Sequence, residues 1–458
     1  MEYLVHSMGS YVITNGLVIT MDDRNRIIRG GCVVVEDGVI VDVGKARDLA
    51  EKYDYEKIDA GGNIIMPGLI NTHTHLFQEL GKNLCVDVDL QRWFRSVWAP
   101  LVSNMSIEDY VNAVRLGVLE AIRSGTTTIV AYEHALNAFE GDIDKVVSAI
   151  KGSKIRCIFG YGYQDTGEEI GAPRIALKSL DYIYKRLKEF FSRQKQDDMF
   201  RVWLAPGTIN WCTKELLSLT KELADKYNTG ITVHMNETKA EKEYSIKKRG
   251  GSEVEYAYSV GFLGPNVLGV HLVWTDSREI EILARTNTKV SHNPISNMYL
   301  ASGIAPIPEM LRKNIIVGLA TDGAASNNNM DMFDVIRITP LLHKVVHGDP
   351  TALSALDTLR MATIMGAKAI MMEEKIGSLE KGKYADIIIV DIHKPNTTPI
   401  YDPIATLVYS ASSCNVDTVI INGKIMMMNR KLTYMDEEKI IENAQKSLQR
   451  ITDRMNKQ

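Results

Sequence analysis

The stretch Ile64-Ile65-Met66-Pro67-Gly68-Leu69-Ile70-Asn71-Thr72-His73-Thr74-His75 decides the fold. Its apolar first half predicts a buried strand, and that strand ends in two histidines separated by one residue. Side chains two residues apart point to the same face of a strand, so His73 and His75 can face one pocket. Paired neutral imidazoles suit Zn²⁺, Fe²⁺ or a similar borderline metal. A lone His-x-His also occurs by chance where a strand ends. The rest of the chain must therefore distinguish a metal site from two ordinary polar residues.

From His73 onward, apolar strand-like runs alternate with long helical stretches. Seven further runs follow the first, at residues 126–130, 155–159, 200–204, 231–234, 267–271, 289–292 and 315–322. Regular alternation of strand and helix predicts a parallel sheet, and eight such units predict an α/β fold with a closed (β/α)₈ TIM-type barrel.

Both ends of the chain predict short strands with little helix between them. Asn15-Gly16 and Asn422-Gly423 separate neighbouring apolar runs, and such pairs favour tight turns between antiparallel strands. We therefore expect both termini to build one small β-sandwich domain, followed by a charged terminal helix. The predicted segments are residues 1–66 and 375–458 for this domain and residues 67–374 for the barrel.

Composition narrows the class of protein. The 458 residues are 45% hydrophobic and 24% charged, which is typical of a globular protein with a large core. A net charge of −4 gives no basic footprint for nucleic acid, and no apolar run has membrane-spanning length. The five cysteines contain no Cys-x-x-Cys pair, which argues against a disulfide framework. With no signal peptide evident, we expect a cytoplasmic protein.

Polar side chains gather where the predicted barrel strands end, the face at which barrel enzymes place their chemistry. His234 ends the fifth strand, His271 the sixth and Asp322 the eighth, and Glu237 follows three residues after His234. Three imidazoles and one carboxylate can hold one metal ion with a coordination position left for water. Glu237 is close enough to serve as a general acid or base.

Each of these residues has an ordinary structural explanation when it is taken alone. A single His234 or His271 would more often be a hydrogen-bonded core histidine, and Asp322 would be a turn residue. Their joint occurrence at separate strand ends is what favours a metal site. His292 is expected either to line the pocket or to brace a loop, and His134 is expected to be a structural or a surface residue.

Six motifs spread along the chain carry a family resemblance. They are Pro67-Gly68-Leu69-Ile70-Asn71-Thr72-His73-Thr74-His75, Ser124-Gly125-Thr126-Thr127-Thr128, His234-Met235-Asn236-Glu237, Ser291-His292-Asn293-Pro294, Thr321-Asp322-Gly323-Ala324-Ala325-Ser326-Asn327-Asn328-Asn329 and Gly377-Ser378-Leu379-Glu380-Lys381-Gly382-Lys383-Tyr384-Ala385-Asp386. Over essentially its whole length the chain resembles the amidohydrolase superfamily. It resembles the branch that holds the methylthioadenosine/S-adenosylhomocysteine deaminases and the s-triazine hydrolases, including atrazine chlorohydrolase and melamine deaminase.

The resemblance implies a metal centre with four ligands, namely His73, His75, His234 and Asp322. Zn²⁺ is the expected metal and Fe²⁺ the alternative. Binuclear relatives use a bridging lysine on the fourth strand, but Leu204-Ala205-Pro206-Gly207 contains none, so one divalent metal per chain is expected.

The resemblance also implies the chemistry. A metal-activated hydroxide would replace the exocyclic amino or imino group of a small cyclic amidine or guanidine by oxygen, with release of ammonia. Glu237 would carry protons, His271 would orient the hydroxide or polarise the substrate, and Asp322 would accept a proton. Candidate rings are a triazine, a pterin, an oxidised purine, a pyrimidine or a creatinine-like ring. A cytidine-deaminase type of zinc site is excluded because Pro-Cys-x-x-Cys is absent.

Three positions depart from the adenosine-type deaminases. Val86 stands where those enzymes hold the ribose with an acidic residue, although Asp87 and Asp89 are close by in the sequence. Gly207 stands where a histidine holds the purine. Tyr161 replaces an arginine that binds a substrate carboxylate. These departures favour a smaller ring. The residues expected to contact it are Trp93, Gln78, Tyr161, Gly207, Trp211 and His292.

Other functions on the same fold stay open. The same site could remove chloride or an alkylamine from an s-triazine, or it could deaminate an adenosine-type substrate. A non-catalytic scaffold is the least favoured, because a scaffold does not need every one of these polar residues. The resemblance suggests a homodimer or larger homo-oligomer, with a small N-heterocycle as ligand and with neither nucleic acid nor membrane as partner.

Overall fold

The computed structural model describes residues 9–49, 51–134 and 143–457. These residues form two compact units. The first takes its residues from Met1–Asn71, Leu119–Thr128 and Asp331–Glu437, and the second from Thr72–Val118, Ile129–Met330 and Glu438–Gln458. The domain boundaries predicted at residues 66 and 374 stay a prediction.

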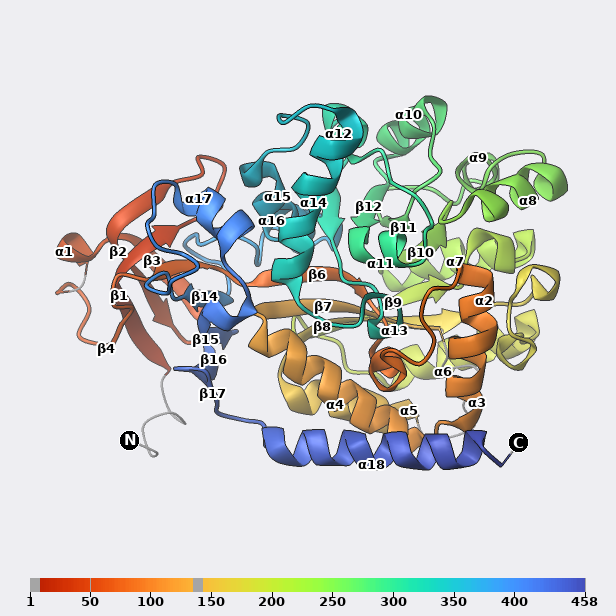
Figure 1. The fold of residues 1–458 in the computed structure, drawn as a ribbon, viewed down its shortest axis with the longest axis horizontal. Coiled ribbons are helices and arrows are strands. Elements are labelled where there is room, and N and C mark those ends of the chain that lie inside the picture. The colour runs from red at the N-terminus through yellow and green to blue at the C-terminus, as the bar shows by residue number, and fades with distance from the viewer. Residues whose placement is uncertain (1–8, 50, 135–142, 458) are drawn as a thin grey trace. The chain divides into compact units, whose positions relative to one another are not determined.

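An eight-stranded parallel sheet, in which the strands follow one another in chain order, forms the barrel (Figure 1). Its strands are β6 (Leu69–Thr74), β7 (Thr126–Glu133), β8 (Arg156–Tyr163), β9 (Phe200–Pro206), β10 (Ile231–Met235), β11 (Val267–His271), β12 (Lys289–His292) and β13 (Val317–Leu319). Every residue of β7 and β8 is buried, as expected for strands that are covered on both faces.

The first and last barrel strands meet near their carboxyl ends. Thr72 Oγ1 donates a hydrogen bond to the Leu319 carbonyl over 3.0 Å, and the Asp322 amide donates to the His73 carbonyl over 3.1 Å. Gly318 allows this approach, because a Cβ at that position would lie 2.4 Å from Thr72 Cγ2. The barrel is therefore nearly closed, which confirms the predicted fold class.

Helices follow the barrel strands along the chain. In α6, for example, Ile183, Leu187 and Phe190 are buried at helical spacing, so one apolar stripe packs inward. None of the helices in the described residues is both long and apolar enough to cross a membrane. The main helices are α4 (Ile107–Arg123), α5 (Ile143–Ser153), α6 (Leu180–Arg193), α7 (Lys214–Tyr227), α8 (Lys239–Arg249), α9 (Glu253–Ser259), α10 (Ser277–Thr286), α11 (Pro294–Tyr299), α12 (Ile307–Arg312), α14 (Met332–His347), α15 (Ala355–Met361), α16 (Ile364–Ala369) and α18 (Glu437–Met455).

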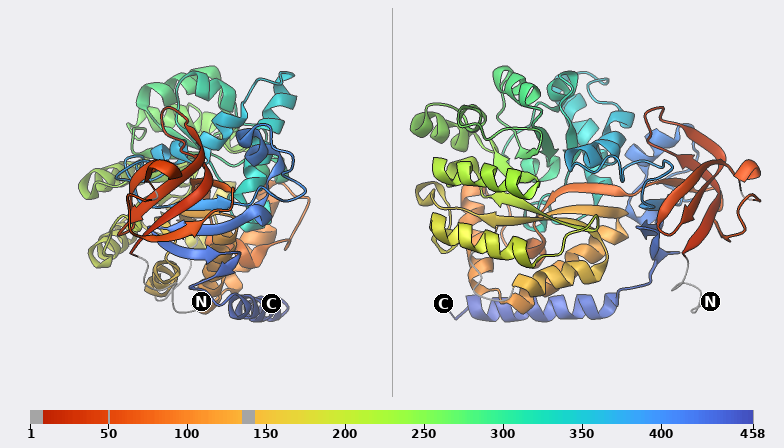
Figure 2. Two further views of the ribbon diagram at one scale, coloured as in Figure 1. Left: turned by 90° about the vertical axis from the view of Figure 1, so that its left-hand side faces the viewer. Right: turned by 180° about the vertical axis from the view of Figure 1, so that it is seen from behind.

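Strands from both termini join one nine-stranded mixed sheet, as predicted. Figure 2 shows its N-terminal strands in red alongside its C-terminal strands in blue. In β2, Val33 and Val35 belong to one apolar cluster, whereas Cys32 and Val34 belong to another, so the sheet buries both faces. The strands are β1 (Ser10–Ile19), β2 (Ile27–Glu36), β3 (Val39–Lys45), β4 (Glu56–Asp59), β5 (Ile64–Pro67), β14 (Ile387–Val390), β15 (Val416–Ile421), β16 (Lys424–Met428) and β17 (Lys431–Leu432).

One predicted turn is wrong. Asn15-Gly16 does not end a strand but forms an irregularity inside the continuous strand β1. Asn15 takes the left-handed conformation with φ of 56°, which bends the strand without reversing it. Gly16 is required there, since a Cβ would lie 2.3 Å from Ile65 Cδ1. Asn422-Gly423, by contrast, does connect the antiparallel strands β15 and β16.

The apolar run that begins at Ile64 also divides differently from expectation. It forms two strands, β5 and β6, that are separated at Gly68. β5 pairs with β1 and β14 in the mixed sheet, whereas β6 belongs to the barrel sheet. A Cβ at Gly68 would lie 2.2 Å from Thr127 Cγ2, so only glycine fits at the change between the two sheets.

Two arginines of the terminal helix α18 form ion pairs with one buried carboxylate of α4. Arg450 Nη2 lies 2.6 Å from Asp109 Oδ1, and Arg454 Nη1 lies 2.9 Å from Asp109 Oδ2. Asp109 is fully buried on α4, whereas the arginines are 38% and 40% exposed. Burial raises the pKa of Asp109, but hydrogen bonds from Arg454 and Ser106 outweigh it and lower the pKa to about 2.

We expect Asp109→Asn to lower the free energy of unfolding by ~2 kcal/mol at pH 7, between the values for exposed and for buried ion pairs. A lowered carboxyl pKa stabilises the fold above the unfolded-state value of ~3.9, and that stability is lost as the pH falls toward about 2. Urea unfolding at pH 7 and pH 3 should therefore show the wild type and the variant converging in acid. Glu108→Gln is the matched control, since Glu108 is 77% exposed. Equal destabilisation by both variants would contradict the assignment.

Candidate active site

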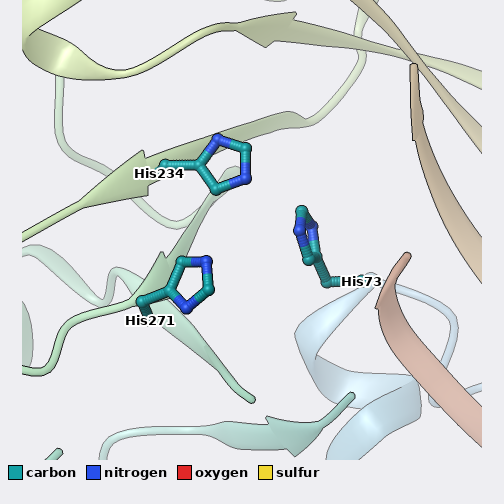
Figure 3. A group of neighbouring side chains, drawn as sticks. All are labelled: His73, His234 and His271. Atoms are coloured by element: carbon teal, nitrogen blue, oxygen red, sulfur yellow. The ribbon is translucent and has the colours of Figure 1, made fainter. Parts of the chain in front are cut away.

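Imidazoles from three barrel strands meet at the carboxyl ends of the sheet. His73 belongs to β6, His234 to β10 and His271 to β11, and Figure 3 shows their rings turned toward one space. The Nε2 atoms of His73 and His75 lie 3.1 Å apart. Asp322 Oδ1 lies 3.4 Å from the first of these atoms and 3.3 Å from the second.

Backbone carbonyls orient two of the rings. His75 Nδ1 lies 2.5 Å from the Tyr132 carbonyl, and His234 Nδ1 lies 2.8 Å from the Gly207 carbonyl. A carbonyl oxygen can only accept, so each Nδ1 carries the proton. The Nε2 lone pairs of both rings are then free to bind a metal.

The charge state of these groups also suits a cation. Burial lowers the pKa of His73 to about 3, so its ring is neutral. Burial alone would raise the pKa of Asp322, but its close contacts with the imidazoles of His73 and His75 outweigh it and hold the pKa well below its usual value. Neutral imidazoles beside an ionised carboxylate are the forms that bind divalent metals.

Among the described residues, two overlapping sets of donors fit a metal ion. The donor atoms of His73, His75 and Asp322 lie within 4.8 Å of one another, and so do those of His73, His234 and His271. His73 belongs to both sets. The donor chemistry therefore fits one divalent transition metal, while the choice of four ligands stays a prediction.

Glu237 lies beside this donor set. Its Oε2 is 3.5 Å from His271 Nε2, and the residue is only 6% exposed. Burial raises the pKa of Glu237 well above its usual value, and the nearby carboxylates Glu241, Asp322 and Glu253 raise it further. A carboxyl group that holds its proton near neutral pH can act as a general acid.

The backbone is strained at two of these positions. His271 has φ of 71° and Asp322 has φ of 63°, and Leu272 continues the first distortion with φ of 50°. Residues other than glycine rarely adopt this left-handed conformation, which costs about 1–3 kcal/mol and is found at functional sites. The fold therefore holds the backbone in a strained conformation at His271 and Asp322, beside the polar side chains of the site.

A cavity opens beside the donor set, and four of the predicted substrate-binding residues line it, namely Gln78, Trp93, Gly207 and Trp211. Its aromatic side includes Phe94, whose ring centroid lies 5.3 Å from that of Trp93 and 5.1 Å from that of Trp211. These rings, inclined to one another by 74° and 56°, offer an apolar wall for a heterocycle.

The structure places Tyr161 and His292 outside this lining. Tyr161 lies within β8, and its ring packs against Phe190 of α6 with centroids 4.7 Å apart. It faces away from the cavity because alternate residues of a strand point to opposite faces. His292 ends β12 and is fully buried. Direct contact with a ligand in this cavity is expected from neither residue.

Gly207 has a steric reason to be glycine. A Cβ at this position would lie 2.9 Å from Trp211 Cε3 and 3.2 Å from Gln164 Oε1. A histidine at position 207 would displace the Trp211 ring. The observed position of the Trp211 ring therefore requires a small residue at position 207.

Sequence reasoning missed His134, which lines the cavity although we expected it to be structural. It follows directly after the last residue of β7, so it stands at a strand end like the predicted residues. Applying that criterion to every barrel strand would have found it. Glu241 also lines the cavity, but its Oε2 accepts a hydrogen bond from the Thr238 amide as part of a helix cap.

Comparisons with known proteins identify the family of this chain. The model of the amidohydrolase family matches residues 64–426. The chain is 39% identical over 453 residues to a 5'-deoxyadenosine deaminase of Methanosarcina acetivorans, covering 98% of this chain and 100% of that protein. It is 35% identical over 439 residues to a 5-methylthioadenosine/S-adenosylhomocysteine deaminase of Thermodesulfovibrio yellowstonii, covering 95% and 97% of the two chains.

A solved structure is similar over nearly the whole chain. It is an adenosine deaminase from Xanthomonas campestris with bound zinc, with a TM-score of 0.90 at 28% identity. The similarity covers 97% of this chain and 98% of that one. The fold, the polar site at the strand ends and the match over most of the chain lead to one conclusion. The chain belongs to the amidohydrolase family.

Proposed function

We propose that the protein is a metal-dependent hydrolytic deaminase. It replaces the exocyclic amino group of a cyclic amidine or guanidine by oxygen and releases ammonia. The observation that carries the proposal is the position of Glu237, a buried carboxyl group with a raised pKa beside His271 and the donor set. The relatives named as deaminases support the same reaction type.

The proposed roles follow from the geometry. A divalent metal held by His73, His75, His234 and Asp322 would, when bound, activate water for attack on the ring carbon. The protonated Glu237 would deliver its proton to the ring nitrogen, while Asp322 would accept the proton that the attacking water loses. Glu237 would then take the remaining proton of the added hydroxyl group and pass it to the departing amine, so that ammonia leaves and the ring carbon keeps the oxygen.

His271 has a role that its hydrogen bond defines. Its Nδ1 donates to Asn297 Oδ1 over 2.8 Å, which leaves the Nε2 lone pair turned toward Glu237. We therefore assign Nε2 as the acceptor that orients the attacking water. A neutral ring of this tautomer cannot donate from Nε2 to the substrate.

The proposed metal is zinc. Imidazole and carboxylate donors suit it, and the related adenosine deaminase of Xanthomonas campestris was solved with zinc bound. We also propose that the protein is cytoplasmic and that it forms a homo-oligomer. Light scattering of the purified protein would test the oligomeric state.

Deamination of an adenosine with a modified 5' position is the second candidate, and the names of the relatives favour it. The position expected to hold a ribose is occupied by Val86, which is 48% exposed and has no hydrogen-bonding side chain. Loss of chloride or an alkylamine from an s-triazine is the third candidate, because the same activated water would attack the same type of carbon.

We expect about one zinc per chain by elemental analysis and ammonia release from at least one aminoheterocycle. The panel contains aminotriazines, aminopterins, guanine, aminopyrimidines, creatinine, 5'-deoxyadenosine and a chlorotriazine. A chelator should abolish activity, and added zinc should restore it. If the metal-loaded protein releases chloride or an alkylamine but no ammonia, the deaminase proposal is wrong.

A further inference from the structure

His134 is a cavity residue that the proposed reaction does not use. It lines the same cavity as His75, His234 and Glu237 and is 4% exposed. Phe77 packs against it edge to face, with ring centroids 5.3 Å apart and an interplanar angle of 81°. The ring is therefore held in one orientation beside the proposed reaction centre.

Trp98 determines which nitrogen of His134 carries the proton. The Trp98 indole N–H donates a hydrogen bond to His134 Nε2, and the two rings lie at an interplanar angle of 14°. An indole nitrogen can only donate, so Nε2 must present its lone pair. The proton of the neutral imidazole is then on Nδ1.

The Nδ1–H group of His134 has no acceptor that the structure shows among the described residues. Its recorded contact is His75 Nδ1 at 3.3 Å. That atom already carries a proton, which it donates to the Tyr132 carbonyl over 2.5 Å. Two N–H groups cannot hydrogen bond to each other, so the His134 proton needs an acceptor from the cavity. A buried donor without an acceptor costs about 1–3 kcal/mol, which a ligand atom would recover.

We infer that His134 is a substrate-positioning residue that donates a hydrogen bond from Nδ1 to an acceptor atom of the bound heterocycle. The inference rests on the proposed function for the identity of that ligand. The acceptor is a ring nitrogen or a ring carbonyl oxygen. His134 therefore orients the ring relative to the metal ligands and contributes to substrate choice.

Gln78 is a second polar residue in the lining of the same cavity. Its Oε1 is buried and has no hydrogen-bond partner among the described residues. The amide lies against Gly323, where a Cβ would come within 2.0 Å of Oε1, so glycine makes the room for it. The amide of Gln78 carries both an acceptor and a donor, so a turn of this side chain would let it match either kind of ring atom.

The test compares three variants on the best amino substrate of the panel. His134→Phe keeps the ring but removes the donor, and we expect kcat/KM to fall by about 10- to 100-fold, mostly through KM, with metal content unchanged. His134→Asn retains an N–H near the position of Nδ1 and should recover activity to within about threefold of wild type. Trp98→Phe frees Nε2 and should give an intermediate loss.

A deaza analogue of that substrate locates the acceptor. Where the ring nitrogen that His134 addresses is replaced by C–H, His134→Phe should cost no more than about twofold. If His134→Phe is within twofold of wild type on the parent substrate, or if His134→Asn is as impaired as His134→Phe, the inference is wrong.

Nitrogen NMR separates this inference from the proposed function. In the zinc-loaded protein with ¹⁵N-labelled histidine, the coupling pattern of His134 should show the Nδ1–H tautomer, and the Nδ1 resonance should shift when a heterocycle of the panel binds. An Nε2–H tautomer, or no shift on binding, would overturn the role of His134 even if ammonia is released. If no ammonia is released but the tautomer and the shift are found, the deaminase proposal fails and the binding role stands.

Discussion

Replacing Glu237 by glutamine is expected to lower turnover of an amino substrate by at least ~10²-fold, while metal content and substrate affinity stay close to wild type. An amide anion is a very poor leaving group, so the departing nitrogen needs a proton. Glu237 is the carboxyl group next to His271, and burial raises its pKa so that it holds a proton to give. Glutamine keeps the shape of the side chain and removes that proton. Steady-state kinetics and elemental analysis of the two proteins measure the effect.

Two controls sharpen this comparison. Glu241→Gln changes a second carboxylate of the same cavity, one whose Oε2 is engaged in a helix cap, and should lose far less turnover than Glu237→Gln. A chlorinated heterocycle should also be less affected by Glu237→Gln, because chloride leaves without a proton. Near wild-type release of ammonia by Glu237→Gln would show that another group supplies the proton.

His73→Ala is expected to lose both bound metal and activity. His73 belongs to both donor sets, and its Nε2 lies 3.1 Å from that of His75. Water cannot replace this ligand without weakening the site. Metal content after dialysis is the measurement. The matched control is His292→Ala, which removes another buried strand-end histidine but leaves the cavity lining unchanged. Retention of about one metal per chain in His73→Ala would contradict the ligand assignment.

Much of the fold could be predicted because its signals are local and repeated. Apolar runs such as 267–271 alternate with helices, and chain order then determines strand order in a parallel barrel. The polar residues that meet in the site were found by one rule, their position at strand ends. The turn predicted at Asn15-Gly16 was wrong because a residue in the left-handed conformation occurs in a β-bulge as well as in a turn, and the local sequence does not distinguish the two.

The substrate side of the site depends on contacts between distant segments. Gly207 and Trp211 fit each other in space, a relation that neither residue reveals alone. The same is true of His134, whose tautomer depends on an indole 36 positions earlier in the chain. Tyr161 was misplaced because the face to which a strand residue points cannot be read from a strand in which every position is buried.

The joining of β6 to β13 has a consequence for synthesis of the protein. The Thr72–Leu319 and His73–Asp322 bonds connect residues about 250 positions apart. A ribosome that adds ~5–20 residues per second needs tens of seconds between the first predicted metal ligand and the last. Throughout that interval the nascent chain presents His73 and His75 without their carboxylate partner. If Asp322 is a ligand as predicted, we expect tight binding of a divalent metal only after β6 and β13 have joined, and a chain stalled before Asp322 should bind the metal only weakly.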